Sequence, residues 1–327
     1  MGVNLRVKIE KVAHGGVFVA RHEGRVIFVS GAIDGEVVDV EVTEDAGKFL
    51  RATVTNVVEA SEHRQPHFWK AARDGAGGAE FGHISLAHQR ELKSQVLAEA
   101  LQRMAGIDLE TQVEACPQET DGLHYRTRVQ LNVDASGTAG PMRPRSNEAV
   151  FSPTLPLAVT EIEELGLQLK NWNGVKKISI AASSTGDLQW LVDDKVNGSE
   201  RLVERAAGRT FRLSSGAFWQ VHKDAANLLT KAVFEAAELV EFDAAKPALD
   251  LYAGAGLFAA TMAAKYNSTS FTAVENNKQA VADGSKSAID LSNLKFEKSD
   301  VLQFLRAASA FCSLTHTYWS LLTSLPT

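Results

Sequence analysis

The chain has 327 residues, of which 45% are hydrophobic and 23% are charged, and its formal net charge at pH 7 is −6. This composition is typical of a soluble globular protein, and the length suits two or three domains of about 100–200 residues each. The net charge argues against bulk basic attraction to nucleic acid, although a few well-placed cations still suffice for phosphate contacts. We find no apolar run of the length that a membrane span or a signal peptide needs, and two cysteines, Cys116 and Cys312, provide neither a disulfide framework nor a four-thiolate metal site. We therefore expect a cytoplasmic protein.

Residues 1–60 alternate between apolar and polar side chains in five short runs, which are separated by turn signals such as Asp34-Gly35. This pattern predicts a small antiparallel barrel of the OB type. Such a barrel is either a structural cap or a nucleic-acid module, and the pattern alone favours neither. Lys48 and Arg51 flank an aromatic residue and are candidate RNA contacts, although many solvated strand edges have the same composition.

Residues 61–84 are rich in glycine and predict a loop, whereas residues 85–105 carry apolar side chains at helical spacing and end at Gly106. His83 and His88 lie near this junction. Because no cysteine or third ligand is nearby, we interpret them as surface or core histidines rather than metal ligands.

A second α/β region follows, with strands predicted over residues 124–133, 175–182 and 188–192. Arg126 and Arg128 lie on one face of the first of these strands, and Arg143 and Arg145 lie in a proline-containing turn. These arginines form either a solvated face or a set of phosphate contacts.

The last third of the chain predicts a doubly wound parallel sheet with alternating strands and helices. An apolar strand that contains Asp250 runs into a turn with Gly254 and Gly256, and a helix follows through Lys265. A second strand ends in Glu275, about twenty residues past the turn, where a nucleotide-binding fold places its ribose-binding acid. This paired spacing favours a nucleotide-type ligand over a purely structural turn.

Together these segments resemble the S-adenosylmethionine-dependent RNA (uracil-5-)-methyltransferases, the family of the bacterial 23S rRNA and tRNA 5-methyluridine enzymes. Residues 1–60 look like the TRAM barrel of that family, and Gly75–His83 aligns with its Cys-Gly-Gly-Cys-x-x-x-His loop. Ser215–His222 looks like its Phe-x-Gln-x-Asn motif, and Leu249–Glu275 looks like its cofactor strand and turn. The resemblance implies a multi-domain α/β protein with four parts: a TRAM/OB-like barrel (1–60), a linker of loop and helix with a degenerate iron–sulfur loop (61–107), a central α+β RNA-binding region (108–208) and an incomplete Rossmann-like class I methyltransferase domain (209–327).

The resemblance also implies residue roles, each with a structural alternative. Gln220 would contact the methionine part of S-adenosylmethionine or the target uracil, Glu275 would accept the ribose hydroxyls, and Asp300 would bind the adenine amino group. The alternatives are a helix cap for Gln220, a solvated strand end for Glu275 and an N-cap for Asp300. The complete cofactor set is Gln220, Asp250, Tyr252, Gly254, Gly256, Glu275 and Asp300, and the RNA set is Lys48, Arg51, Arg126, Arg128, Arg143, Arg145 and Phe218.

Three departures from the family pattern qualify these roles. Ala76 and Ala79 occupy the Cys-Gly-Gly-Cys positions, so we predict no iron–sulfur cluster and no other metal. His222 stands where the family has asparagine. Most importantly, the family's cysteine nucleophile and glutamate base follow an Asp-Pro-Pro-Arg motif that residues 1–327 do not contain, and we interpret Cys312 as incidental. We therefore expect a C-terminally truncated chain, through either a genuine truncation or a frame error, in which the sheet lacks its second half and leaves an unpaired edge and an apolar face.

The predicted function is a methyltransferase that forms 5-methyluridine, in 23S rRNA rather than tRNA, with S-adenosylmethionine as cofactor. We expect this chain to lack turnover, and the full-length form to be a monomer without a membrane partner. One alternative is an RNA-binding module with a vestigial cofactor fold. A weaker alternative is a methyltransferase that acts on a small molecule or a protein.

Overall fold

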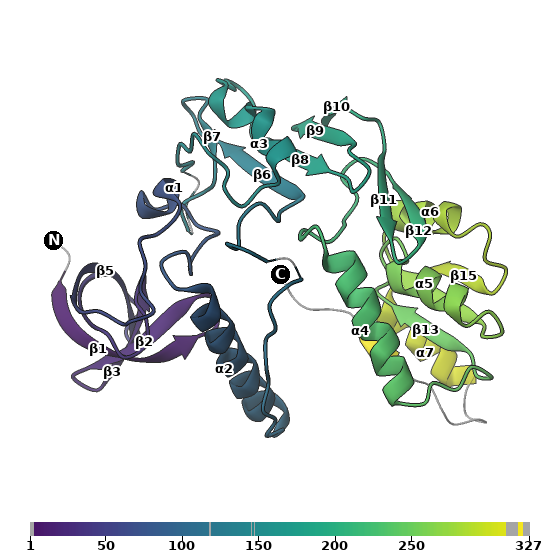
Figure 1. Cartoon of the computed structure of the whole chain (residues 1–327), viewed down its shortest axis with the longest axis horizontal. Coiled ribbons are helices and arrows are strands. Elements are labelled where there is room, and N and C mark those ends of the chain that lie inside the picture. Colours follow the sequence, from purple (N-terminus) through teal and green to yellow (C-terminus); the bar gives the residue numbers. More distant parts are fainter. Residues whose placement is uncertain (1–2, 118, 145, 147, 312–319, 323–327) are drawn as a thin grey trace. The chain divides into compact units, whose positions relative to one another are not determined.

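A computed structural model describes residues 3–117, 119–144, 146, 148–311 and 320–322 of the chain. The protein forms two compact units, one comprising Met1–Leu123 and Thr138–Pro153, the other comprising His124–Gly137 and Thr154–Thr327 (Figure 1). Within the described residues, we find no helix that combines the length and the apolar character needed to cross a membrane.

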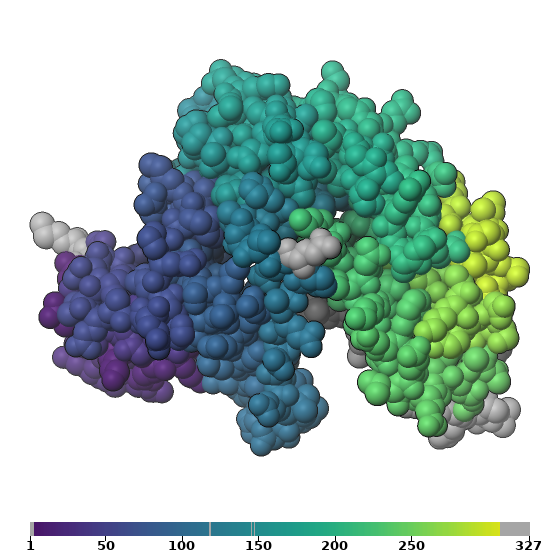
Figure 2. All heavy atoms as spheres, viewed as in Figure 1, coloured from purple at the N-terminus to yellow at the C-terminus, as the bar shows by residue number. Residues whose placement is uncertain are grey.

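The first unit begins with the barrel that the alternating pattern predicts. Its strands follow the order β1-β2-β3-β5-β4 and close on themselves; all neighbours are antiparallel except β3 and β5. Phe18 and Ile27 point inward and are fully buried, as is Ile33 in the turn before β4. Figure 2 shows the barrel residues, coloured purple to slate blue, gathered together at one end of the colour range. The strands are β1 (Asn4–Ala13), β2 (Val17–His22), β3 (Arg25–Ser30), β4 (Val37–Asp45) and β5 (Phe49–Glu59).

The helix that the spacing predicts over residues 85–105 is present, and it packs beside the barrel. This helix, α2 (Leu86–Ala105), buries Leu92 in the barrel core and ends at Gly106 in a left-handed conformation. The loop before it is not wholly irregular, because Lys70–Arg73 form a single helical turn, α1. Lys, Ala and Arg favour helix, and the turn ends before Asp74-Gly75. The unit also contains the short strand β7 (Ala139–Gly140).

The second unit contains an antiparallel sheet in which β10, β9, β8 and β6 are neighbours, followed by a hairpin of β11 and β12. The predicted strand over residues 124–133 begins only at Arg128 in the structure. The chain turns at His124, whose φ is 51°, and the backbone N–H groups of residues 125–127 bond to Leu157 and Val221 rather than to β8. The elements are β6 (Arg128–Val133), α3 (Thr160–Glu164), the 3-10 turn η1 (Leu167–Leu169), β8 (Lys177–Ala182), β9 (Leu188–Val192), β10 (Lys195–Gly198), β11 (Leu202–Ala206) and β12 (Arg209–Leu213).

A parallel sheet with the order β15-β14-β13-β16 completes the second unit, and its helices alternate with its strands as predicted (Figure 1). The sequence did not predict the fourth strand, β16, which pairs with β13 on the side opposite β14. β13 is therefore an interior strand of this sheet. The elements are α4 (Ala225–Leu239), β13 (Ala248–Leu251), α5 (Leu257–Lys265), β14 (Phe271–Glu275), α6 (Lys278–Ser287), β15 (Leu294–Lys298), α7 (Val301–Phe311) and β16 (Ser320–Leu322).

Candidate cofactor site

The three acids of the predicted cofactor set lie at the carboxyl ends of three adjacent parallel strands. Asp250 lies in β13, Glu275 ends β14, and Asp300 follows β15 by two residues. Ligands of open α/β sheets bind at this edge, near the point where the strand order reverses. In this sheet the order reverses between β13 and β16. The fold thus brings these predicted residues to the edge where a cofactor is expected.

The glycine turn after β13 uses its two glycines differently. Both have positive φ, 57° at Gly254 and 79° at Gly256. A Cβ at Gly256 would lie 2.4 Å from the ring of Phe296, so this glycine permits internal packing. A Cβ at Gly254 would meet nothing within 4 Å. Gly254 therefore leaves open backbone at the strand edge, which is the property that a ligand-binding glycine needs.

Glu275 is bound directly to this turn. Its Oε2 accepts a hydrogen bond of 2.9 Å from the Gly254 N–H, and its Oε1 accepts one of 2.7 Å from the Asn277 N–H. These bonds hold the carboxylate at the end of β14 in a fixed orientation. Each carboxylate oxygen has a second lone pair, so the group can still accept two hydroxyls of a vicinal diol.

Asp250 is almost completely buried, with 6% of its surface exposed. Its Oδ2 accepts a 2.9 Å bond from the N–H of Ala259 in the first turn of α5, whereas its Oδ1 has no hydrogen-bond partner among the described residues. Burial raises the pKa of Asp250 to about 7, although the bond from Ala259 opposes this and the charge of Glu275 adds to it. Asp250 thus joins β13 to α5 and retains one buried acceptor beneath the turn.

Tyr252 follows β13 with a φ of 62°, which is rare for a residue with a side chain. Nearly half of its surface, 47%, is exposed. Strained backbone of this kind is concentrated at ligand sites, where the surrounding structure holds it in place. The conformation is consistent with the predicted role of Tyr252 in cofactor binding.

The segment that contains Phe218, Trp219 and Gln220 lies against the same core as the glycine turn. Trp219 is buried in a cluster with Ala255 and Leu257, so the segment and the turn share one packing surface. Gln220 is half-buried, and Phe218 is 68% exposed. The next residue, Val221, accepts a 2.7 Å bond from the Thr127 N–H through its backbone carbonyl.

Asp300 caps α7, as its structural alternative predicted. Its Oδ1 accepts a 3.0 Å bond from the N–H of Gln303, three residues further on. This is the bond that an N-cap aspartate makes. Asp300 also lies at the carboxyl edge of the sheet, so the cap and the predicted adenine contact are compatible: the capping bond uses Oδ1 only.

The predicted RNA residues have varied surroundings. Lys48 is exposed on the barrel, while the guanidinium of Arg51 lies 5.2 Å from the ring centroid of Phe49 and pairs with Glu44 at 3.2 Å. Arg143 pairs with Glu148 at 3.2 Å, and Arg145 lies outside the described residues.

In the second unit, Arg126 is half-buried, whereas Arg128 forms an ion pair of 2.6 Å with Glu204. Only 15% of the Arg128 side chain and 5% of the Glu204 side chain are exposed. Arg128 also donates to the carbonyls of Thr127 and Ala182. The two arginines therefore do not form one solvated face, and the contacts of Arg128 are those of a structural residue.

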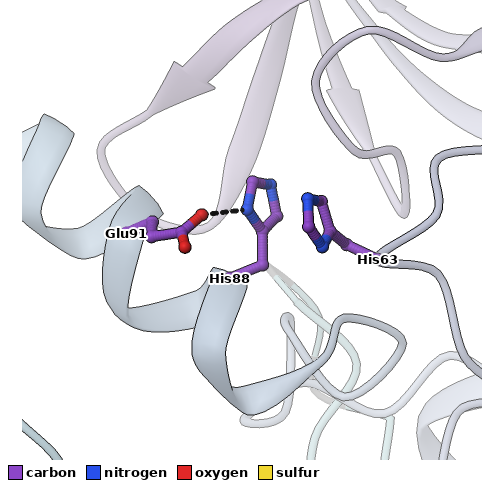
Figure 3. Close-up of side chains that lie close together, drawn as sticks. All are labelled: His63, His88 and Glu91. Carbon is purple, nitrogen blue, oxygen red and sulfur yellow. Dashed lines mark hydrogen bonds and ion pairs between the residues drawn. The ribbon is translucent and has the colours of Figure 1, made fainter.

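The histidines near α2 have structural contacts too. His83 is buried and its Nε2 lies 3.0 Å from the carbonyl oxygen of Ala32. His88 stacks on His63, with ring centroids 3.9 Å apart and planes inclined by 13° (Figure 3). Burial lowers the pKa of His88, but its hydrogen bonds to Asp34 and Glu91 outweigh this and raise it.

His63, His88 and Glu91 bring potential ligand atoms within 4.8 Å of one another, as a metal site requires. Two nearly parallel rings, however, cannot both direct an in-plane lone pair at one ion about 2.1 Å from each nitrogen. Both nitrogens of His88 also lie within hydrogen-bond distance of carboxylates, at 2.7 Å from Glu91 and 2.9 Å from Asp34. We therefore interpret this cluster as a structural contact of α2 with the loop after β5 and, through Asp34, with the turn before β4.

Ala76 and Ala79, at the predicted cysteine positions, lie in a small apolar cluster. Trp69, Ala71, Ala76 and Val150 are buried there, and Ala79 packs against them. The indole N–H of Trp69 donates a 2.8 Å bond to Ser152. This packing gives the loop a core of its own.

Comparison with known proteins shows which proteins the chain is similar to. Residues 2–55 match the TRAM domain family. The chain is 34% identical to an uncharacterized RNA methyltransferase of Streptomyces avermitilis, over 92% of this chain and 79% of the relative. Over 39% of the chain and 28% of the relative, it is 34% identical to the 23S rRNA (uracil(1939)-C(5))-methyltransferase RlmD of Shewanella amazonensis.

A solved structure has the same fold. This is the tRNA (uracil-54, C5)-methyltransferase of Pyrococcus abyssi in complex with S-adenosyl-L-homocysteine, which is 18% identical, with a TM-score of 0.66 over 90% of this chain and 80% of that one. This likeness shows that the chain has a methyltransferase fold. By its relatives, the chain belongs to the RNA methyltransferase family, and its first residues form the TRAM barrel.

Sequence reasoning missed several features around the site. It did not find the internal bond from Gly254 to Glu275, the burial of Asp250 or the contacts of Ser214 with Asp283. Of these three features, only the bond between Gly254 and Glu275 could have been expected from the sequence. The offset of about twenty residues between the turn and Glu275 implies that their strands are adjacent.

Proposed function

We propose that this protein binds S-adenosylmethionine at the carboxyl edge of its parallel sheet and serves the methylation of uridine at C5 in RNA. The observation that carries the cofactor site is the bond between the Gly254 N–H and the Glu275 carboxylate. It joins the open glycine turn to the acid that suits a ribose diol, within one rigid strand pair.

The residues present fit this cofactor. Glu275 offers acceptors for the ribose hydroxyls, and the open face of Gly254 permits close approach of the ligand. The unsatisfied Oδ1 of Asp250 places a buried acceptor near the turn, where a cationic ligand would favour its ionised form. When bound, the cofactor supplies an electrophilic methyl group on a sulfonium. In our proposal Gln220 and Tyr252 orient its methionine part, and Asp300 accepts from its adenine amino group through Oδ2.

For the RNA we propose 23S rRNA rather than tRNA, because the family resemblance favours it, and we place the enzyme in the cytoplasm with its substrate. Lys48, Arg51, Arg126, Arg143 and Phe218 are the proposed RNA contacts that remain available. The purely RNA-binding alternative is not favoured, since the turn, Glu275 and Asp250 retain the arrangement that a cofactor needs.

Calorimetric titration with S-adenosylhomocysteine tests the cofactor site. We expect saturable binding that Glu275→Ala weakens at least tenfold, because the variant loses both ribose acceptors. Glu297→Ala is the matched control: this residue lies on the neighbouring strand and pairs with Lys295 at 2.9 Å. Equal affinities of the two variants would rule out Glu275 as the ribose ligand.

We further propose that residues 1–327 bind both ligands but do not complete methyl transfer, because they lack the Asp-Pro-Pro-Arg motif that precedes the family's nucleophile and base. Incubation with 23S rRNA and cofactor labelled in the methyl group measures this directly. Incorporation of label by the chain would contradict this part of the proposal and leave the cofactor site unaffected.

A further inference from the structure

A three-residue hydrogen-bond network fixes the start of the segment that carries Gln220. Ser214 donates from its backbone N–H to Asp283 Oδ2 at 2.8 Å and from its hydroxyl to Asp283 Oδ1 at 2.7 Å. Gln279, one turn earlier on α6, donates to the Ser214 hydroxyl at 2.8 Å and to Asp283 Oδ1 at 3.0 Å. Asp283 is 3% exposed, so the carboxylate depends on these bonds in place of water.

The next residue on α6 contacts the glycine turn. A Cβ at Gly284 would lie 2.9 Å from the carbonyl oxygen of Ala255 and 2.3 Å from the ring of Phe296. The backbone of α6 therefore packs directly on the turn that contains Gly254. Two consecutive residues, Asp283 and Gly284, thus connect the Gln220 segment and the glycine turn to the same point of one helix.

Other contacts besides those of Asp283 attach α6 to the preceding hairpin. Ser287 accepts the Arg212 N–H at 3.0 Å, and Asp290, just beyond the helix, pairs with Arg209 at 2.6 Å (Figure 1 shows α6 beside β12). A buried carboxylate is costly unless hydrogen bonds compensate its lost hydration. Two of the bonds that compensate Asp283 come from Ser214. Ser214 is the residue at which the chain leaves β12 and enters the segment of Phe218, Trp219 and Gln220.

We propose that Asp283 and Gln279 are positioning residues that hold the Gln220 segment in register with the Gly254 turn, so that both sides of the cofactor site are aligned before the cofactor binds. This inference rests on the cofactor site proposed above. Pre-alignment matters because a ligand that must first order its site loses affinity by the cost of that ordering.

Calorimetry with S-adenosylhomocysteine on Asp283→Asn tests the proposal. The amide replaces one acceptor oxygen with a donor, so the substituted side chain cannot accept both bonds from Ser214. We expect affinity to fall about tenfold, an equal fall in Ser214→Ala, and little further loss in the double variant, because both substitutions remove one network. Ser214→Thr retains the hydroxyl and should restore most of the affinity.

Asp290→Asn is the control on the same side of the unit, since it weakens the Arg209 pair without touching the network. It should lower the melting temperature and leave the affinity unchanged. Amide hydrogen exchange adds a readout that global destabilisation does not give: residues 214–222 should exchange faster in Asp283→Asn under conditions where α4 and β13 remain protected.

Two results would overturn the positioning role while leaving the cofactor site intact: wild-type affinity in Asp283→Asn and Ser214→Ala, or losses that add fully in the double variant. If the unsubstituted chain does not bind S-adenosylhomocysteine, the cofactor site itself is contradicted, and the positioning role falls with it. The pattern across the variants therefore separates the two failures.

Discussion

The behaviour of Asp250 is set by its burial. Its pKa is raised from 3.8 to about 7, so the folded protein holds this proton more tightly than the unfolded chain does. An acid with a raised folded pKa destabilises the native state progressively as the pH rises from the unfolded pKa to the folded one. The cost is complete above about pH 7 and is at most about 4 kcal/mol, since each pKa unit corresponds to about 1.4 kcal/mol.

We expect Asp250→Asn to remove this pH dependence. The amide oxygen can still accept from Ala259, and the variant has no charge to bury. In urea titrations, the stability of the variant relative to the wild type should rise by roughly 2–4 kcal/mol between pH 5 and pH 8. A difference that stays constant over this range would show that Asp250 does not titrate as its burial implies.

Gly254 and Gly256 should respond differently to the same substitution. Gly256→Ala combines a left-handed backbone with a clash against Phe296, and it should lower stability by more than about 2 kcal/mol. Gly254→Ala has the backbone cost of about 1 kcal/mol only, because its Cβ meets open space, but the methyl group should obstruct the cofactor. Thermal unfolding and calorimetric binding measure the two effects. Equal stability losses, or unimpaired binding by Gly254→Ala, would contradict the division of roles.

The sequence carried part of this site at the residue scale. The spacing between the glycine turn and Glu275 predicted two adjacent parallel strands, and the structure brings these residues into hydrogen-bond contact. The partner of Arg128 could not be predicted, because Glu204 lies 76 residues away and the pairing depends on how β6 and β11 pack. The bond between Ser214 and Asp283 could not be predicted for the same reason, because the two residues are 69 positions apart in the sequence.

At the scale of elements, the Arg128–Glu204 pair connects β6 to the hairpin of β11 and β12. Glu204→Ala would leave a buried guanidinium without its counterion and should cost about 3–5 kcal/mol. Glu148→Ala removes a similar pair with Arg143, but there both side chains are substantially exposed, and the cost should stay below about 1 kcal/mol. Chemical denaturation of both variants measures the contrast. Similar small losses would mean that Arg128 finds water or another acceptor.

In the loop around Ala76, apolar side chains pack at the positions where the family pattern has cysteine thiolates. Trp69 fills the cluster and bonds to Ser152, so Trp69→Ala should lower the stability of the first unit by about 3–5 kcal/mol. A metal chelator should leave the melting temperature of the wild type unchanged. A chelator-induced loss of stability, or iron that copurifies in stoichiometric amount, would contradict our expectation that this loop needs no metal.

Local patterns also predicted most elements. Alternating side chains predicted the barrel strands, because one face of each strand is buried. They did not predict α1, because its four residues are too few to show a helical period. They also did not predict β16, which is a strand by virtue of its pairing with β13. Short elements depend on tertiary contacts, and a single sequence window does not contain those contacts.

At the scale of the whole molecule, we propose that a cofactor site lies along the carboxyl ends of β13, β14 and β15. Hydrogen exchange of the intact chain, measured with and without S-adenosylhomocysteine, tests it most directly. We predict that the ligand protects the amides of residues 252–256, 275–279 and 300–303, and leaves the barrel strands unchanged. Binding without protection of these three stretches, or protection confined to other parts of the chain, would contradict the account.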